Sequence, residues 1–477
     1  MADVHQQLLH EIRQRSAAAQ QAETDAKKLP PELSTWRNTL GMMQPLLLAA
    51  FRCMLIRNAF ACVCGVTLLC RGCFSGQIWQ LSLGLLLFAL AIRGLPGGTP
   101  FLEVQTEAGF YAAADGCCAS RNEQIRQSMQ AWMRCFEPCP WQRSGEVCTM
   151  LPYITNTKRF GELKYERMWI EAEDGERFAS DWVFPPTGFD ASRPVVVLLT
   201  GLAPSQHWTQ AAGFIADAAW YLTHRASMTV VVMVSRGTMD THVNANMFHG
   251  ARVTDLRKLL EAMTPCLENV SGGEKATIFA AGFSMGAIIL ANYCGHYGKD
   301  PLLAGGIHFS GVHDCAMNMK FQYSRDTWQA FLALSLKQTL MGGRMTEEAR
   351  RRGVNIDHVM SSKVASVVDV DEEFVTIFNG YDGVLDYYRD VSVAAEDKWR
   401  SVSIPLLAVA ARDDPITHCD ALRAKEFSTA NENLLFLITE RGGHVGWPWG
   451  IFPWQHGWDF MNQAIEVFVD TALMSKK

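Results

Sequence analysis

Residues 276–290 contain two apolar runs, which are separated by the sequence Gly-Phe-Ser-Met-Gly at residues 282–286. The first run is long enough for a buried strand, and the second has helical potential. A serine flanked by glycines at such a junction is typical of a nucleophile elbow, the strained turn that exposes a serine hydroxyl between a strand and a helix. Gly282 and Gly286 would let the two segments approach closely. Ser284 is therefore the candidate nucleophile.

The same five residues also occur as an ordinary glycine-rich turn after a core strand, so the partners of Ser284 decide between the two interpretations. An acidic residue and then a histidine are expected later in the chain. The apolar run 406–411 predicts a strand that ends at Asp413-Asp414, and the run 434–439 is followed by Gly-Gly-His444. Carboxyl ends of parallel strands meet at one edge of a sheet. We therefore predict a triad of Ser284, Asp414 and His444, with Asp413 as the alternative acid.

Other apolar runs predict the rest of the sheet. Residues 165–173 and 177–184 alternate around an Asp-Gly turn, which indicates an antiparallel pair. Buried strands are predicted at 194–200, 228–234 and 303–310, and a crossover helix begins at Thr254. Alternating strands and helices indicate an α/β protein with a parallel sheet.

Two backbone amides are candidates for an oxyanion hole. One follows the strand 194–200, which ends at Gly201-Leu202, and the other belongs to the residue after the nucleophile. We predict the amides of Leu202 and Met285.

Two segments of the catalytic half lie outside this alternation. Residues 312–401 separate two predicted strands and have helical character, which favours a cap over the site. The aromatic stretch 445–454 follows His444 directly. It would line an acyl pocket, dip into a membrane interface or pack against the cap.

The N-terminal third divides into an arm with an apolar segment (1–72), a hydrophobic stretch (73–93) and a connector (94–160). A solvated helix or flexible arm is expected at the start of the arm. Residues 73–93 match a hydrocarbon core of about 30 Å and predict a single membrane-anchoring helix, with a buried helix packed on the catalytic domain as the alternative. Trp132, Phe136 and Trp141 would pack the connector against that domain, which is expected over 161–477.

Charge and cysteine usage exclude some functions. Lys and Arg number 43 against 49 Asp and Glu, with no basic run, so nucleic acid is not an expected partner. The 14 cysteines lack the paired spacing of a zinc site or a disulfide framework, and no metal is predicted.

These features together resemble the AB hydrolase 4 family of membrane-associated α/β-hydrolase domain proteins, which includes monoacylglycerol and phospholipid lipases and ethanol acyltransferases. The resemblance covers about residues 165–469. Thr200, Ala203-Pro204 and Ser235 depart from the residues usual in the family, so the substrate side of the oxyanion loop would differ. The matching motifs are Asp174-Gly175, Asp181-Trp182, Gly201-Leu202, Ser235-Arg236-Gly237, His249-Gly250-Ala251, Thr254-Asp255-Leu256, the elbow, Asp413-Asp414-Pro415 and Gly442-Gly443-His444.

The resemblance implies an α/β-hydrolase fold with a mostly parallel eight-stranded sheet, a helical cap at about 312–401 and an N-terminal membrane-anchoring helix. It implies a serine hydrolase that cleaves lipid carboxylic esters delivered from the membrane, such as acylglycerols or phospholipids, without a cofactor. Transfer of the acyl group to an alcohol proceeds through the same acyl-enzyme and remains an alternative. A catalytically silent binding scaffold is a third hypothesis.

Overall fold

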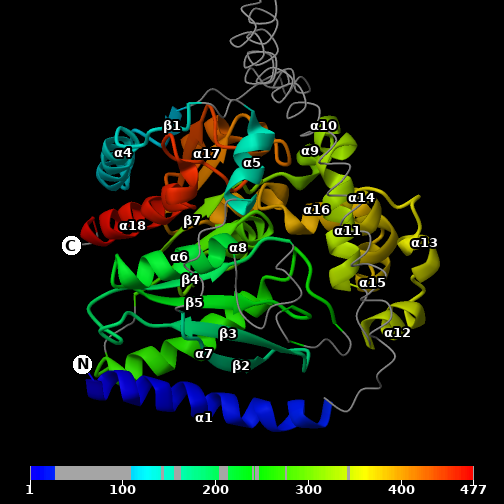
Figure 1. The fold of residues 1–477 in the computed structure, drawn as a ribbon, viewed down its shortest axis with the longest axis horizontal. Coiled ribbons are helices and arrows are strands. Elements are labelled where there is room, and N and C mark those ends of the chain that lie inside the picture. The colour runs from blue at the N-terminus through cyan, green and yellow to red at the C-terminus, as the bar shows by residue number, and fades with distance from the viewer. Residues whose placement is uncertain are drawn as a thin grey trace, which may run out of the picture.

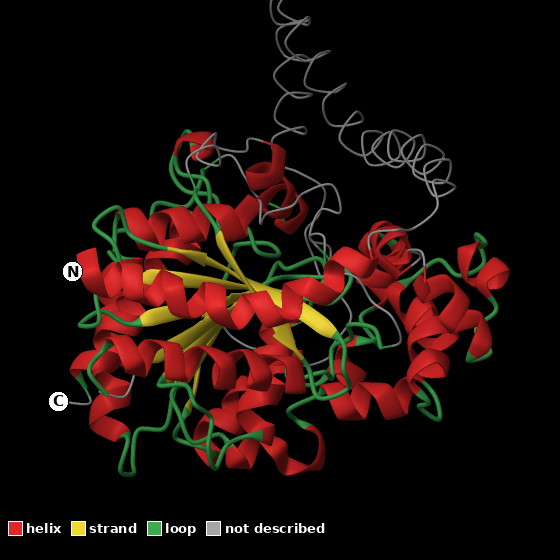
Figure 2. Ribbon diagram, turned by 90° about the horizontal axis from the view of Figure 1, so that it is seen from below, coloured by secondary structure: helices red, strands yellow, loops and turns green. Residues whose placement is uncertain are grey.

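The computed structural model describes residues 2–26, 109–140, 144–154, 163–202, 213–238, 241, 246–273, 277–340 and 344–475. Strands run through the centre of the molecule between two layers of helices (Figure 2). Nine strands form one sheet in the order β1-β9-β8-β7-β6-β4-β5-β3-β2. Their bounds are β1 Gly109–Tyr111, β2 Glu166–Glu171, β3 Arg177–Val183, β4 Val195–Leu199, β5 Thr229–Val234, β6 Ile278–Phe283, β7 Gly305–Phe309, β8 Leu406–Ala411 and β9 Leu434–Thr439.

Strands β4 to β9 pair in parallel with one another, whereas β1, β2 and β3 pair antiparallel with their neighbours. All eight predicted strands are present as β2 to β9. The prediction of eight strands is wrong by one, because Gly109–Tyr111 of the expected connector adds β1 beside β9. A pattern of three residues is too short to identify from sequence, and β1 covers backbone groups that β9 would otherwise leave unpaired.

Each face of the sheet packs against its own set of helices. On β4, Val195, Val197 and Leu199 join one core cluster. Val196 and Leu198 join the other, as the two-residue period of a strand requires. The first face carries α7 (Thr254–Val270), α8 (Met285–His296) and α17 (Ala424–Ala430), and the second carries α4 (Ala119–Met133), α6 (Gly213–His224) and α18 (Asp459–Met474).

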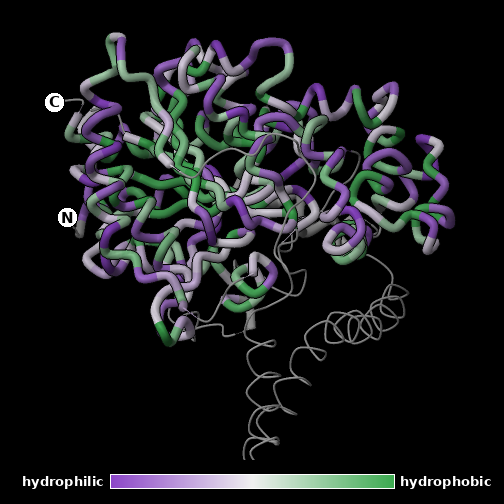
Figure 3. The backbone as a smooth tube through the Cα atoms, turned by 90° about the horizontal axis from the view of Figure 1, so that it is seen from above, coloured by the Kyte–Doolittle hydropathy of each residue, from purple (hydrophilic) through white to green (hydrophobic). Residues whose placement is uncertain are grey.

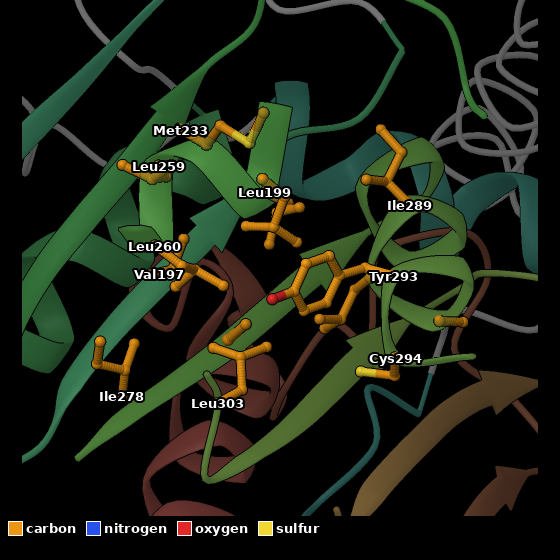
Figure 4. Packing of buried hydrophobic residues seen from close by; sticks show 14 of the residues in the cluster. Val197, Leu199, Met233, Leu259, Leu260, Ile278, Ile289, Tyr293, Cys294 and Leu303 are labelled. Atoms are coloured by element: carbon orange, nitrogen blue, oxygen red, sulfur yellow. The ribbon is translucent and has the colours of Figure 1, made fainter. Parts of the chain in front are cut away.

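The first cluster brings together residues that are far apart in the sequence. Figure 4 shows strand residues such as Val197 and Leu199 facing Leu260 of α7 and Tyr293 of α8. The Tyr293 hydroxyl is not left unpaired, because it donates to the Pro301 carbonyl at 2.6 Å. Hydrophobic residues accordingly concentrate along the central strands of the chain trace (Figure 3).

Helix α1 (Ala2–Ala26) lies against β2 and α7 (Figure 1). Its Leu8 and Ile12 are fully buried in the first core cluster. The Ser16 hydroxyl accepts a hydrogen bond from the Trp169 amide of β2 at 3.3 Å. The expectation of a solvated helix or flexible arm is therefore wrong for this segment, because one face of the helix carries apolar residues at helical spacing that the sheet buries.

The expected connector contains α4 and α5 (Gly145–Ile154). Trp132 packs on Phe460 of α18 with ring centroids 4.7 Å apart, and Phe136 contacts the same ring at 4.7 Å. The expected packing of these two aromatic residues on the catalytic domain is confirmed. Trp141 lies outside the described residues.

The segment expected as a cap forms a separate helical layer at one end of the sheet, shown in yellow in Figure 1. It has its own core, which includes Phe374, Phe378 and Tyr387. Its elements are α9 (Cys315–Asn318), α10 (Gln322–Asp326), α11 (Trp328–Leu340), α12 (Arg344–Arg351), α13 (Ile356–Met360), α14 (Val367–Val370), the π-helix η3 (Asp371–Thr376), α15 (Ile377–Asn379), α16 (Val384–Val391) and η4 (Ala395–Ser401). Two further short helices, η5 (Cys419–Leu422) and η6 (Pro453–Gln455), follow it in the chain.

No helix among the described residues has the length and apolar character needed to cross a bilayer. The membrane-anchoring helix predicted at 73–93 lies outside the described residues.

Candidate active site

Ser284 occupies a sharp turn between β6 and α8. Its backbone has φ 53° and ψ −114°, a conformation that residues other than glycine rarely adopt. Its amide donates to the Phe309 carbonyl of the neighbouring strand at 2.9 Å, which ties the turn to β7. The strained backbone holds the serine at the point where strand becomes helix, as the elbow pattern predicts.

The two glycines of the elbow have no room for a side chain. A Cβ on Gly282 would lie 2.5 Å from the Gly286 carbonyl oxygen. A Cβ on Gly286 would lie 2.3 Å from the carbonyl oxygen of Leu199, on β4. Both contacts are with backbone atoms, which cannot move aside cheaply. The strand and the helix therefore approach closely enough to form the turn only because both positions are glycine.

The three predicted triad residues lie together. His444 Nε2 is 2.8 Å from Ser284 Oγ, and His444 Nδ1 is 2.8 Å from Asp414 Oδ2. Asp414 and His444 are buried, with 1% and 7% of their surfaces exposed, and Ser284 is partly exposed. The arrangement brings three strand-end connections, after β6, β8 and β9, to one edge of the sheet.

Asp414 is fixed by its own local turn. Its Oδ1 accepts hydrogen bonds from the Ile416 and Thr417 amides at 2.8 and 2.9 Å. The Thr417 hydroxyl donates to Oδ2 at 2.8 Å, on the oxygen that faces His444. These donors stabilise the carboxylate and fix its orientation toward the imidazole.

Asp413, the alternative acid, contacts a different part of the site. Its Oδ1 accepts hydrogen bonds from the Gly442 and Gly443 amides, both at 2.9 Å. Burial raises the pKa of Asp413 to about 6. The two adjacent carboxyl groups thus have different contacts: Asp414 contacts the His444 ring, and Asp413 binds the backbone of the loop that precedes His444.

Further contacts hold the His444 loop from other elements. The His444 amide donates to the Thr149 hydroxyl of α5 at 2.8 Å. The Val445 amide donates to the Ser310 hydroxyl after β7 at 2.9 Å. Gly443 has φ +64°, and a Cβ there would lie 2.5 Å from the Gly145 carbonyl oxygen. Sequence reasoning missed Thr149 and Ser310, because neither belongs to a motif and Thr149 lies 295 residues from His444.

Of the two residues expected to supply oxyanion amides, one follows Ser284 directly in the chain and the other follows a glycine that lies beside it. Met285 is the first residue of α8. Leu202 follows Gly201, where a Cβ would lie 3.4 Å from Ser284 Cβ. The remainder of this loop, residues 203–212, lies outside the described residues, including the departures at Ala203 and Pro204.

The motifs at Arg236 and His249 each make contacts in the fold, Arg236 with two carboxylates and His249-Gly250 with the helical insertion. The Arg236 guanidinium donates to Asp255 at 2.7 Å and to Asp174 at 2.6 Å. Burial lowers the pKa of His249 to about 3. The Gly250 amide donates to the Tyr387 hydroxyl of the helical insertion at 3.0 Å, and a Cβ on Gly250 would lie 3.0 Å from Met285 Sδ. This contact connects the insertion to the residue after Ser284.

Two groups of side chains among the described residues have the donor types of a metal site. They are Cys117, Cys118 and Glu432, and His418, Cys419 and Asp420. Neither group contains Ser284, Asp414 or His444.

No protein-family model matches this chain. Curated proteins similar to it include the human Phospholipase ABHD3, 27% identical over 343 residues that cover 70% of this chain and 78% of the relative. Embryogenesis-associated protein EMB8 of Picea glauca is 27% identical over 298 residues, covering 60% and 62%. Medium-chain fatty acid ethyl ester synthase/esterase 2 of Saccharomyces cerevisiae is 24% identical over 277 residues, covering 53% and 58%.

Among solved structures, an esterase of Pyrococcus furiosus, Pf2001, matches 65% of this chain and 92% of its own at 13% identity and a TM-score of 0.36. A putative lipase of Acinetobacter baumannii matches 69% and 97% at 14% identity and a TM-score of 0.37.

Proposed function

We propose that this chain is a serine hydrolase of the AB hydrolase 4 family, to which its relatives point, and that it cleaves carboxylic esters of lipids through an acyl-enzyme. The observation that carries the proposal is the hydrogen-bonded series from Ser284 through His444 to Asp414, with 2.8 Å at each step. A serine, an imidazole and a buried carboxylate in this geometry constitute an activated nucleophile.

The residues act in a defined order. His444 Nε2 takes the proton of Ser284 as Oγ attacks the ester carbonyl carbon. Asp414 accepts a hydrogen bond from His444 Nδ1 and stabilises the imidazolium that forms. The tetrahedral intermediate collapses, His444 donates its proton to the departing alcohol oxygen, and an acyl-Ser284 remains. Water, deprotonated by His444, then attacks the acyl group, and the carboxylic acid leaves as Ser284 regains its proton.

The Leu202 and Met285 amides would stabilise the negative oxygen of each tetrahedral intermediate. Loss of one such donor costs on the order of 3 kcal/mol of barrier in a serine hydrolase. The proposal is supported by the position of Gly201, where a Cβ would lie 3.4 Å from Ser284 Cβ, and by Met285, which begins α8 directly after Ser284.

The printed names of the relatives support a lipid ester as substrate. One is a phospholipase and another an ester synthase and esterase for medium-chain acyl groups. Acylglycerols and phospholipids are the substrate class that we propose for this chain. Acyl transfer to an alcohol is the second candidate, because one relative is named an ethyl ester synthase as well as an esterase. Product analysis in the presence of added ethanol separates the two, since transfer yields an ethyl ester and hydrolysis a free acid.

A fluorophosphonate probe tests the activated nucleophile. We expect the native full-length chain in detergent to be labelled, and the Ser284→Ala variant to be unlabelled. Ser192→Ala changes an exposed serine and is the matched control, which should label like the native chain. If the native chain resists the probe, the proposed activity is wrong and the binding-scaffold hypothesis replaces it.

We also propose that residues 73–93 anchor the chain in a membrane as a single pass. Each arginine placed at the centre of such a span costs about 2.5–3.5 kcal/mol on insertion scales. The double variant Leu85→Arg/Leu86→Arg should therefore release the chain from membranes under alkaline carbonate extraction, while the native chain stays in the pellet. Retention of the variant would favour the alternative of a helix packed on the catalytic domain.

A further inference from the structure

Three apolar side chains lie exposed within four residues of the loop that follows His444. Ile451, Phe452 and Trp454 are 61%, 52% and 44% exposed. Only seven large hydrophobic side chains reach comparable exposure in the part of the chain that the structure describes, and these three are consecutive members of that set. We refer to Ile451, Phe452 and Trp454 as the apolar triplet. A concentration of exposed apolar surface of this kind marks an interaction site.

The backbone that carries the apolar triplet is held firmly. The Gly450 amide donates to the Glu137 carbonyl at 2.6 Å, and Trp449 forms a bridge with Pro138. The Trp449 ring also stacks on His456 at 5.8 Å and meets Phe136 edge-on at 5.4 Å. The apolar triplet is therefore presented outward from a fixed base, and its exposure does not arise from an unanchored loop.

The same connection carries the catalytic histidine. Trp447 is buried, and its indole donates to the Thr439 hydroxyl at the carboxyl end of β9 at 3.0 Å. On the other side, η6 packs beside α5, the helix whose Thr149 binds the His444 amide. The apolar triplet is thus connected through η6 and Trp447 to the elements that hold His444 at the catalytic edge of the sheet.

The route of the chain points to the occupant. Gly109, the first residue of β1, pairs with Ile438 near the carboxyl end of β9, so the chain arrives from residues 94–108 at the catalytic edge. About fifteen residues separate Gly109 from the proposed membrane span, a reach of at most about 55 Å. The span would therefore keep this edge within about 55 Å of the bilayer. Aromatic side chains, tryptophan above all, prefer the boundary between headgroups and acyl chains.

We propose that the apolar triplet inserts into the surface of the bilayer that holds the ester substrate, and seats the catalytic edge on it. This inference rests on the proposed function and assigns its docking surface. Burying the remaining exposed half of three large side chains favours membrane contact by more than a factor of ten.

Activity on two kinds of ester tests the proposal in the full-length chain. The triple variant Ile451→Ser/Phe452→Ser/Trp454→Ser should raise the apparent KM for a phospholipid or diacylglycerol in vesicles at least about tenfold. Its kcat/KM for water-soluble 4-nitrophenyl butyrate should stay within about twofold of native, as for other surface changes. Leu385→Ser, which alters a residue of α16 that is 57% exposed, is the matched control and should change neither value. Equal kinetics of the triple variant and native chain on vesicles would overturn the proposal.

A photocrosslinker identifies the occupant independently of catalysis. With p-benzoylphenylalanine in place of Phe452, illumination of the chain in phosphatidylcholine vesicles should yield a lipid adduct, whereas the same group in place of Leu385 should not. A crosslink from position 452 to a second copy of the chain, or to its own helical insertion, would overturn the proposal. If the native chain hydrolysed neither ester, the proposed function would fail while the lipid adduct still decided the docking surface.

Discussion

Asp413 and Asp414 are adjacent in sequence and have different roles in the geometry of the site. Asp414 faces His444, whereas Asp413 accepts the Gly442 and Gly443 amides. Asp414→Asn should lower kcat by about 10⁴-fold, because an amide cannot stabilise the imidazolium and favours the wrong imidazole tautomer. Asp413→Asn keeps a side-chain oxygen for the two glycine amides and should retain most activity. The kcat of both variants for hydrolysis of 4-nitrophenyl butyrate checks this prediction. If Asp413→Asn lost more activity than Asp414→Asn, Asp413 would be the acid of the triad.

Burial of Asp413 also makes stability depend on pH. Its pKa is about 6 in the folded chain and about 3.8 without burial, so the folded state holds a proton that the unfolded state has released between these values. The free energy of unfolding contributed by this group therefore falls as the pH rises from about 4 to about 6. The Asp413→Asn variant should lack this contribution to the pH dependence of the free energy of unfolding. Thermal unfolding of both chains in detergent at pH 4.5 and 6.5 measures the difference.

Helix α1 is part of the catalytic fold and not an arm attached to it. Leu8 and Ile12 are fully buried against the sheet layer. Leu8→Ala and Ile12→Ala should each lower the free energy of unfolding by about 2–5 kcal/mol, through lost apolar contacts and the cavity left behind. Gln7→Ala, at an exposed position of the same helix, should change it by no more than about 0.5 kcal/mol. Urea unfolding compares the three variants, and equal stability would mean that α1 docks without contributing to the core.

One connection between the helical insertion and the elbow runs through Gly250. Tyr387 of α16 accepts the Gly250 amide, and Gly250 borders Met285. The insertion therefore supports the loop beside the proposed oxyanion amide in addition to its position at the end of the sheet.

Acid sensitivity is a property of the fold taken together, because buried histidines occur in several elements. Burial lowers the pKa of His249 and His313 to about 3, and the pKa of His308 well below its usual value. Below pH 6.5 the unfolded chain binds protons at these positions and the folded chain does not, so the free energy of unfolding falls as the pH falls. Each group contributes a slope of up to about 1.4 kcal/mol per pH unit. Asp413 has the opposite effect on the free energy of unfolding between about pH 4 and 6, but it is a single group against three histidines.

The predicted result is a chain that unfolds at a lower temperature at pH 5 than at pH 7. His249→Phe removes one of the three groups and should reduce the difference between the two pH values. Unfolding temperatures that are equal at pH 5 and pH 7 in the native chain would show that the histidines already titrate normally in the folded state.

Local sequence patterns predict most of the sheet and the chemistry at its edge. Apolar runs and turn residues identify β2 to β9, and the order of Ser284, an Asp-Asp pair and His444 indicates the triad, because each signal lies within a few neighbouring residues. The tight approach of β6 and α8 at the elbow follows from the same pattern, whereas the close approach of Gly286 to β4 is seen only in the structure.

Other features of the fold and the site depend on residues far apart in the chain, and only the tertiary structure determines them. The choice of Asp414 over Asp413 rests on which carboxyl group faces an imidazole contributed by another loop. The support of His444 by Thr149, the pairing of β1 with β9 and the docking of α1 on β2 each join segments separated by more than a hundred residues. Neither partner of such a contact carries a local pattern that specifies the other, so the packing of the complete fold selects the pair.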